Sequence, residues 1–337
     1  MSGLRALGLM SAMSVSTHYV PITDDPGQRV ALHCMAPTQP NGRSVLFVHG
    51  ASFPTMLAFG FEFAPGDSWM GFMARQGFLA CGLDFIGFGA SSRPPQMAND
   101  AASAAPLTRA TDAAREIALA VDYLRTEHGM RSVHLIAHSW GTMAATTFAA
   151  THPDALASLT LFGPIVPGSD KHDPGKHGSG KPAEPVHVAW WSITAEARYQ
   201  QLRYKDVLPT PLSLLEPAIA QRWAGEFEAS APHVQGDPAG ELRIPAGPVA
   251  DIEAAATGSY PCDPATVKVP VFVVYGDYDN VTDDAGAVSF LATFTASPLK
   301  WRTRIEHGTH VMHLEHNRQS LYRSVDAFIR TAEALPP

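Results

Sequence analysis

Long apolar runs and basic clusters are missing from this chain of 337 residues. No window reaches the ~18 to 20 apolar residues that a helix needs to span a bilayer. The N-terminal stretch MSGLRALGLMSAMSVSTHYV breaks into Ser and Met before the apolar core of a signal peptide develops. We therefore expect a soluble, cytoplasmic protein with no membrane partner.

Nucleic acid is not an expected partner either, because no run of Lys and Arg could follow a phosphate backbone and the formal net charge is -8. Cysteine is scarce: Cys34, Cys81 and Cys262 are an odd number, widely spaced, with no C-x-x-C pair. We expect them to be reduced thiols in or near the core. Hydrophobic residues make up 45% of the chain, which is typical of a globular enzyme-sized domain.

What the chain does have is an alternation of short apolar runs with helical patterns. Four runs resemble fully buried strands, after an N-terminal antiparallel pair formed by STHYVPI and RVALHCMA. The four runs are residues 44–50, 77–85, 132–138 and 156–163. The clearest helix is TDAAREIALAVDYLRTEHG, with Thr111 as the expected N-cap and Gly129 as the C-terminal stop. Strands that alternate with helices predict an α/β fold with a parallel sheet.

This alternation is interrupted between residues 164 and 264. A loop rich in Pro, Gly, His and Lys comes first, and two predicted helices follow at roughly 190–207 and 212–229. The strand pattern resumes at VPVFVVYGD, followed by a helix near 283–294, a strand at PLKWRTRIE and a terminal helix from about 315. We therefore predict one core, formed by residues 16–163 and 265–337, with a cap or lid insertion at 164–264.

Three histidines of that loop, His172, His177 and His187, suggest a zinc site at first sight. Their spacing matches no ligand template, and Pro and Gly surround them. We expect a solvated lid loop over 171–187 and no metal.

The motif HLIAHSWGT at 134–142 places Ser139 between a buried strand and a helix. A nucleophile elbow is usually written G-x-S-x-G, and here Ala137 occupies the first position. Since Ala137 and Gly141 are both small, the chain can still make the sharp turn that an elbow needs. The pattern predicts that Ser139 is a nucleophile.

A nucleophilic serine requires a histidine base and a carboxylate that orients it. Two candidate acids, Asp277 and Asp279, end the strand at 269–277 on the edge of the sheet where the elbow lies. Three candidate bases, His307, His310 and His313, lie in EHGTHVMHLEHN. The chain order of serine, acid and histidine is the order used by hydrolases with this elbow.

An oxyanion hole would need two backbone N–H donors. One is expected from Trp140, directly after the nucleophile. The other is expected from Ala51, after the strand SVLFVHG, with Ser52 as the alternative.

Five fragments, FVHGAS, DFIGFGASSRP, AHSWG, YGDYD and GTHVMHLE, resemble the α/β-hydrolase superfamily in their order and spacing. The resemblance implies a mostly parallel eight-stranded sheet flanked by helices, with an inserted, mostly helical cap. It favours Asp279 over Asp277, because the family's acid often follows a glycine by three residues. It also favours His310, which precedes Glu315 by five positions.

Within the superfamily, the chain resembles bacterial carboxylesterases near the monoalkyl-phthalate ester hydrolases and the meta-cleavage C–C hydrolases. The resemblance implies a serine esterase that works through Ser139, Asp279 and His310 and needs no cofactor. C–C bond hydrolysis and a non-catalytic ligand-binding role are the alternatives. Dehalogenases and epoxide hydrolases of this fold have a carboxylate nucleophile where Ser139 stands, which disfavours them.

The substrate is expected to be a small ester with an apolar or aryl part, buried under the cap. The sequence does not indicate which ester, or the oligomeric state. The residues expected to line the pocket are Ser52, Phe53, Trp190, Trp191 and His313.

Overall fold

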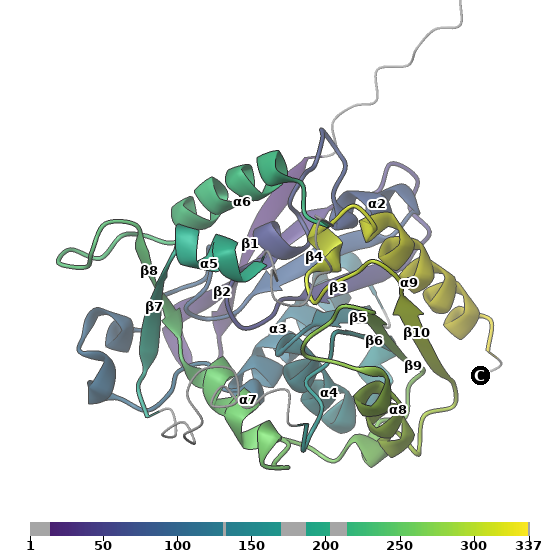
Figure 1. The fold of residues 1–337 in the computed structure, drawn as a ribbon. Helices are drawn as coiled ribbons and strands as arrows, with labels where there is room; N and C mark the ends of the chain where they lie inside the picture. The colour runs from purple at the N-terminus through teal and green to yellow at the C-terminus, as the bar shows by residue number, and fades with distance from the viewer. Residues whose placement is uncertain (1–13, 131–132, 170–186, 203–213, 336–337) are drawn as a thin grey trace, which may run out of the picture.

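The computed structural model describes residues 14–130, 133–169, 187–202 and 214–335. At its centre is an eight-stranded sheet of order β1-β2-β4-β3-β5-β6-β9-β10 (Figure 1). Its strands are β1 (Val15–Ile22), β2 (Asp25–Met35), β3 (Ser44–Val48), β4 (Leu79–Asp84), β5 (Val133–His138), β6 (Leu156–Phe162), β9 (Val271–Gly276) and β10 (Lys300–Ile305). β1 and β2 pair antiparallel with their neighbours and the other pairings are parallel, which confirms the predicted sheet.

Helices cover both faces of this sheet (Figure 1). α3 (Ala110–His128) and α4 (Gly141–Thr151) pack together on one face, and α2 (Trp69–Arg75) and α9 (Arg318–Glu333) lie on the other. The remaining helices of the core are α1 (Thr55–Ala58) and α8 (Asp284–Thr293). Because both faces are covered, β3, β4, β5 and β9 are buried at every position, which explains why their sequences are continuous apolar runs.

The start of α3 differs from the prediction. The helix begins at Ala110, so Thr111 lies inside it and is not the N-cap. The N–H of Ala110 donates instead to the carboxylate of Asp251, at 2.6 Å, from a residue 141 positions later in the chain. The predicted stop is confirmed, since Gly129 adopts the left-handed conformation, with φ of 65°, and its N–H bonds to Leu124.

The described part of segment 164–264 contains both helices and strands. α5 (Ala195–Leu202), α6 (Pro217–Ala229) and α7 (Gly247–Ala256) accompany a two-stranded antiparallel sheet of β7 (Trp190–Thr194) and β8 (Glu241–Pro245). The predicted helix at 190–207 is therefore wrong over its first five residues, where WWSIT forms β7 and pairs with ELRIP. His187 is exposed, whereas His172 and His177 lie outside the described residues.

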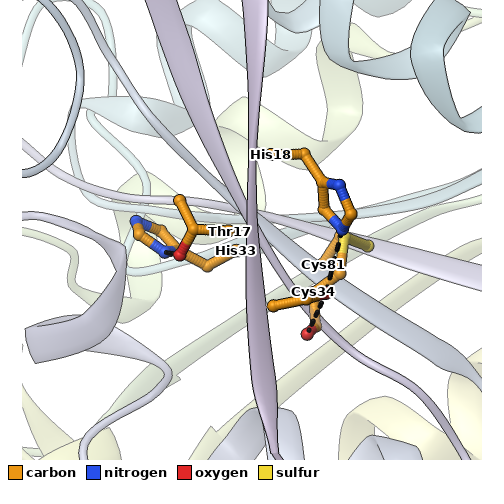
Figure 2. The surroundings of a disulfide bond; sticks show 6 residues. Thr17, His18, His33, Cys34 and Cys81 are labelled. Atoms are coloured by element: carbon orange, nitrogen blue, oxygen red, sulfur yellow. Dashed lines mark hydrogen bonds between the residues drawn. A yellow bond between two sulfur atoms is a disulfide. The ribbon is translucent and has the colours of Figure 1, made fainter.

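The expectation of reduced cysteines is wrong for two of the three. Cys34 on β2 and Cys81 on β4 lie directly opposite each other, and their sulfur atoms form a disulfide (Figure 2). Both side chains are buried in the core, as predicted. Cys262 is free and half-buried. Disulfides are rare in reducing compartments, so the cysteines do not support the expected cytoplasmic location.

The described residues contain neither a candidate membrane span nor a candidate metal site. None of their helices combines the length and apolar character required to cross a membrane. Nor do they bring together three or more His, Cys, Asp or Glu side chains in an arrangement that could hold a metal ion.

Candidate active site

Ser139 lies on a sharp turn between β5 and α4. Its φ of 56° is in the left-handed region, which non-glycine residues seldom adopt. The turn also needs close backbone approach: a Cβ on Gly141 would lie 2.3 Å from the carbonyl oxygen of His49, and a Cβ on Gly50 would lie 3.0 Å from the Cβ of Ser139. Ala137 is fully buried in β5. The sequence A-x-S-x-G thus forms a strained strand–turn–helix, and the side chain of Ser139 stays partly exposed.

His310 connects Ser139 to Asp279. Its Nε2 lies 2.8 Å from Ser139 Oγ, and its Nδ1 lies 3.1 Å from both carboxylate oxygens of Asp279. Because an ionised carboxylate can only accept hydrogen bonds, Nδ1 carries the proton and Nε2 presents its lone pair to the serine hydroxyl. This tautomer is the one required to remove a proton from Ser139.

Asp279 lies just after β9, and its side chain is fully buried. Its Oδ1 also accepts the backbone N–H groups of Val281 and Thr282, at 2.8 and 3.0 Å. The other candidate acid, Asp277, accepts instead the backbone N–H of Gly308 at 3.1 Å. Asp279 therefore contacts the side chain of His310, whereas Asp277 contacts the backbone of the loop that carries His310.

The loop that carries His310 is held by Glu315. The carboxylate of Glu315 accepts the backbone N–H of Thr309 at 3.0 Å and also accepts the hydroxyl of Thr309. Burial raises the pKa of Glu315 to about 7. His307, the first candidate base, is exposed at the turn before this loop and has φ of 57°. The structure thus brings only His310, of the three candidates, to Ser139 Oγ.

The backbone N–H groups of Ala51 and Trp140 are the expected oxyanion donors. Within the part of the chain that the structure describes, neither group donates to a protein acceptor. Trp140 directly follows Ser139, and Gly50, which precedes Ala51, lies so close to Ser139 that a Cβ on Gly50 would be 3.0 Å from the Cβ of Ser139. The indole of Trp140 is fully buried and donates to Asp251 Oδ2 at 3.0 Å.

Two further histidines pack behind His310. His138 Nε2 donates to the carbonyl oxygen of His310 at 2.8 Å, so it holds the backbone of the base. Burial lowers the pKa of His138 well below its usual value and lowers the pKa of His313 to about 3. Both rings are therefore neutral near pH 7. His313 is fully buried against Phe53, Phe162 and His138, with ring centroids 6.2, 5.4 and 4.7 Å away.

The residues predicted to line the pocket are not all brought together. Phe53 is buried and meets Trp223 of α6 edge to face, with ring centroids 5.2 Å apart. Ser52 is half-buried in the same loop. Trp190 donates to the carbonyl of Asn99 at 3.1 Å and lies 3.9 Å beneath the guanidinium of Arg243.

Trp191 is half-buried on β7 and faces the guanidinium of Arg198 at 5.7 Å. No described contact connects either tryptophan to Ser139, so their pocket role stays a prediction. Trp223 of α6 connects segment 164–264 to Phe53, and its indole donates to the carbonyl of Leu57 at 3.0 Å.

Gly163, directly after β6, is a residue whose role the sequence analysis missed. Its φ is 54°, and a Cβ there would lie 2.8 Å from His310 Nδ1 and 3.1 Å from Asp279 Oδ2. A side chain at this position would collide with the hydrogen-bonded pair. The only signal in the sequence is a glycine directly after the strand LASLTLF.

A cavity of about 650 Å³ opens elsewhere, along α3 beside the turn between β1 and β2. None of the three residues Ser139, Asp279 and His310 lines it. Its wall includes Glu116, which accepts the N–H of Ile86 at 2.9 Å and whose pKa burial raises to about 8. The position of the candidate active site therefore rests on the hydrogen-bonded side chains and not on this cavity.

Comparison with known proteins agrees with this fold. The sequence profile of a family described as "alpha/beta hydrolase fold" matches residues 44–317. The chain belongs to the alpha/beta hydrolase fold family. No curated protein gave a significant match.

Solved structures with this fold are similar over nearly the whole chain at low identity. E-2-(Acetamidomethylene)succinate hydrolase is 18% identical, with a TM-score of 0.60 over 94% of this chain and 100% of that one. Naproxen esterase from Bacillus subtilis is 14% identical, with a TM-score of 0.57 over 94% and 92%. Epoxide hydrolase VrEH1 from Vigna radiata is 17% identical, with a TM-score of 0.59 over 94% and 98%. These likenesses show the fold.

Proposed function

We propose that the protein is a serine hydrolase that cleaves carboxylic esters through Ser139, His310 and Asp279. The observation that carries the proposal is the position of His310, whose two ring nitrogens reach Ser139 Oγ at 2.8 Å and the Asp279 carboxylate at 3.1 Å. The free N–H groups of Ala51 and Trp140 support it, because they provide donors next to the nucleophile.

In the first half of the reaction, Ser139 Oγ attacks the ester carbonyl carbon while His310 Nε2 takes the hydroxyl proton. The carbonyl oxygen becomes an oxyanion and binds the N–H groups of Ala51 and Trp140. When the carbon–oxygen bond to the alcohol breaks, His310 returns the proton to the departing oxygen. An acyl group then remains on Ser139, and Asp279 has stabilised the imidazolium throughout.

In the second half, water attacks the acyl carbon and gives a proton to His310 Nε2. The second tetrahedral oxyanion uses the same two amides. Its collapse breaks the bond to Ser139 Oγ, which takes the proton back from His310, and the carboxylic acid leaves. We expect a small ester whose apolar or aryl part packs near Phe53, because that ring lies between His313 and Trp223.

The test combines a mechanism probe with a substrate comparison. We expect a fluorophosphonate to label Ser139 in the wild type, and Ser139→Ala to lose both the label and the turnover of a short p-nitrophenyl ester. Ser289→Ala, at an exposed serine on α8, is the matched control and should keep both. Ester turnover that persists in Ser139→Ala would exclude this mechanism. Faster cleavage of a vinylogous diketone than of any ester would favour C–C hydrolysis by the same residues.

A further inference from the structure

The peptide group between Ser139 and Trp140 is fixed at its carbonyl end. The carbonyl oxygen of Ser139 accepts both the backbone N–H and the hydroxyl of Thr142, at 2.9 and 2.6 Å. Since a trans peptide is planar, the N–H of Trp140 points to the opposite side of the same plane. Thr142, which is fully buried, therefore determines the direction in which the proposed oxyanion donor points.

Trp140 is also fixed through its side chain. The indole N–H of Trp140 donates to Asp251 Oδ2 at 3.0 Å, and the ring meets Phe85 edge to face at 5.4 Å. Phe85 in turn meets the ring of His49, with centroids 4.8 Å apart, just before Gly50 and Ala51. Trp140 and His49, which come from the two loops with the proposed oxyanion donors, thus both pack on the ring of Phe85.

Asp251 comes from α7 of the inserted segment and is buried, with 6% of its side chain exposed. Besides the indole, it accepts Arg109 Nε at 2.5 Å and the N–H of Ala110 at 2.6 Å. A buried carboxylate with three donors, one of them charged, is held rigidly. Arg109 and Ala110 would be sufficient to tie α7 to the start of α3, whereas the bond to the indole reaches the residue that carries the oxyanion donor.

We infer that Thr142 and Asp251 are positioning residues that together aim the Trp140 N–H at the oxyanion, and that the inserted segment takes part in catalysis through Asp251. The inference rests on the proposed function, because it assumes that an oxyanion forms at Ser139. Neither residue touches the substrate. Their loss should therefore weaken binding of the transition state and leave binding of the ground state unchanged.

The experiment uses the full chain and three single variants, Thr142→Val, Asp251→Asn and Trp140→Phe, with the double variant Asp251→Asn/Trp140→Phe. Thr142→Val has nearly the same shape but lacks the hydroxyl. Trp140→Phe keeps the backbone N–H and the ion pair of Asp251 with Arg109, and removes the indole donor together with part of the buried ring. Steady-state kinetics on a p-nitrophenyl ester give kcat and KM. A trifluoromethyl ketone, which forms a tetrahedral adduct with the nucleophile, reports on oxyanion binding.

We expect kcat to fall about tenfold in each single variant with KM unchanged, less than the ~10²-fold to 10³-fold loss on removal of an oxyanion donor. The inhibition constant for the ketone should rise by the same factor as kcat falls. The double variant should lose little more than either of its single variants, since both remove one contact.

Asp237→Asn is the matched control. It weakens the pair between Arg243 and Asp237, at 2.6 Å, which is half-buried in the same segment 164–264 and has no described contact with Trp140. We expect it to lower the melting temperature without changing kcat. If Asp251→Asn only lowers the melting temperature in the same way, and Trp140→Phe and Thr142→Val keep wild-type kcat and ketone affinity, the inference is wrong. A wild type that a fluorophosphonate does not label would contradict the proposed function instead.

Discussion

Among the described residues, two buried His–Asp pairs stand out, and each histidine also contacts a hydroxyl. In the first, His310 joins Asp279 at 3.1 Å and Ser139 Oγ at 2.8 Å. In the second, His33 of β2 joins Asp84, at the end of β4, at 2.9 Å and Thr17 Oγ1 of β1 at 2.9 Å. Figure 2 shows Thr17 beside His33, next to the disulfide. Judged by distances alone, the two sets are equivalent.

The two sets differ in the backbone that carries the hydroxyl and in the other partners of the carboxylate. Thr17 lies inside the regular strand β1, opposite His33, whereas Ser139 is lifted out of its strand by a turn with φ of 56°. The carboxylate oxygens of Asp84 also accept the backbone N–H groups of Thr55 and Ala90, at 2.8 and 3.0 Å, so Asp84 fixes the backbone at these two residues. A hydroxyl, an imidazole and a carboxylate joined by hydrogen bonds are therefore not enough to identify a catalytic site. The strained turn at Ser139 and the free backbone amides distinguish the candidate active site from the second set.

The largest expected difference between the pairs is in turnover. Asp279→Asn should lower kcat by about 10³-fold to 10⁴-fold, because an amide at that position can favour the wrong tautomer of His310. Asp84→Asn should leave kcat, measured per folded molecule, close to the wild-type value. Equal losses of kcat in the two variants would show that the pairs do not differ as proposed.

The second pair should matter for stability instead. Burial alone would raise the pKa of Asp84, but the hydrogen bond and charge of His33 outweigh it and hold that pKa below its usual value. We expect Asp84→Asn to lower the free energy of unfolding by about 2 to 3 kcal/mol, as loss of a buried paired charge does. Urea unfolding at pH 7 measures it. Because a lowered pKa stabilises the fold above the unfolded value, the contribution should vanish as the pH falls below about 4.

Glu315, which holds the loop of the first pair, should show the opposite pH dependence. Its pKa is raised to about 7, so the fold favours the protonated form. This stabilisation is complete below the unfolded pKa and is lost as the pH rises through 7. Glu315→Gln should therefore gain about 1 to 2 kcal/mol over the wild type between pH 5 and pH 8, measured by urea unfolding across that range. A constant difference between the two proteins would contradict the raised pKa.

The smallest expected effect is at Thr17. Thr17→Ala removes an exposed hydroxyl and should change the free energy of unfolding by about 0.5 kcal/mol or less. Turnover and fluorophosphonate labelling of Ser139 should be unchanged. Mass spectrometry of the labelled wild type should find the label on Ser139 and none on Thr17, and a label on Thr17 would mean that the second set is also reactive.

Much of the core could be predicted from the sequence because local patterns determine it. Continuous apolar runs predicted β3, β4 and β5, and the glycine after α3 predicted its end. The order of Ser139, Asp279 and His310 along the chain led to three side chains that the fold brings within hydrogen-bonding distance. Strand ends in a parallel sheet meet at one edge, so adjacency there follows from topology.

The errors occurred where distant residues decide the local structure. Trp, Ile and Thr favour strands, but the helical pattern of the residues that follow WWSIT led to the prediction of a helix. The segment forms β7 because β8, about fifty residues later, pairs with it. Thr111 is not the N-cap because the carboxylate of Asp251 takes that role from the inserted segment. The disulfide could not be predicted, since the facing positions of Cys34 and Cys81 depend on the register of β2 with β4.

Gly163 connects the spacing of the strands in the sheet to the geometry of the candidate active site. In the sheet, β6 lies between β5, which leads to Ser139, and β9, which leads to Asp279. His310 must therefore bridge two strand spacings of ~4.8 Å each, above the end of β6. The imidazole with its two hydrogen bonds has about this span, and a bare backbone at Gly163 leaves room for it. The width of the sheet thus matches the length of the hydrogen-bonded chain from Ser139 to Asp279, and one added methyl group at its midpoint would be enough to break that chain.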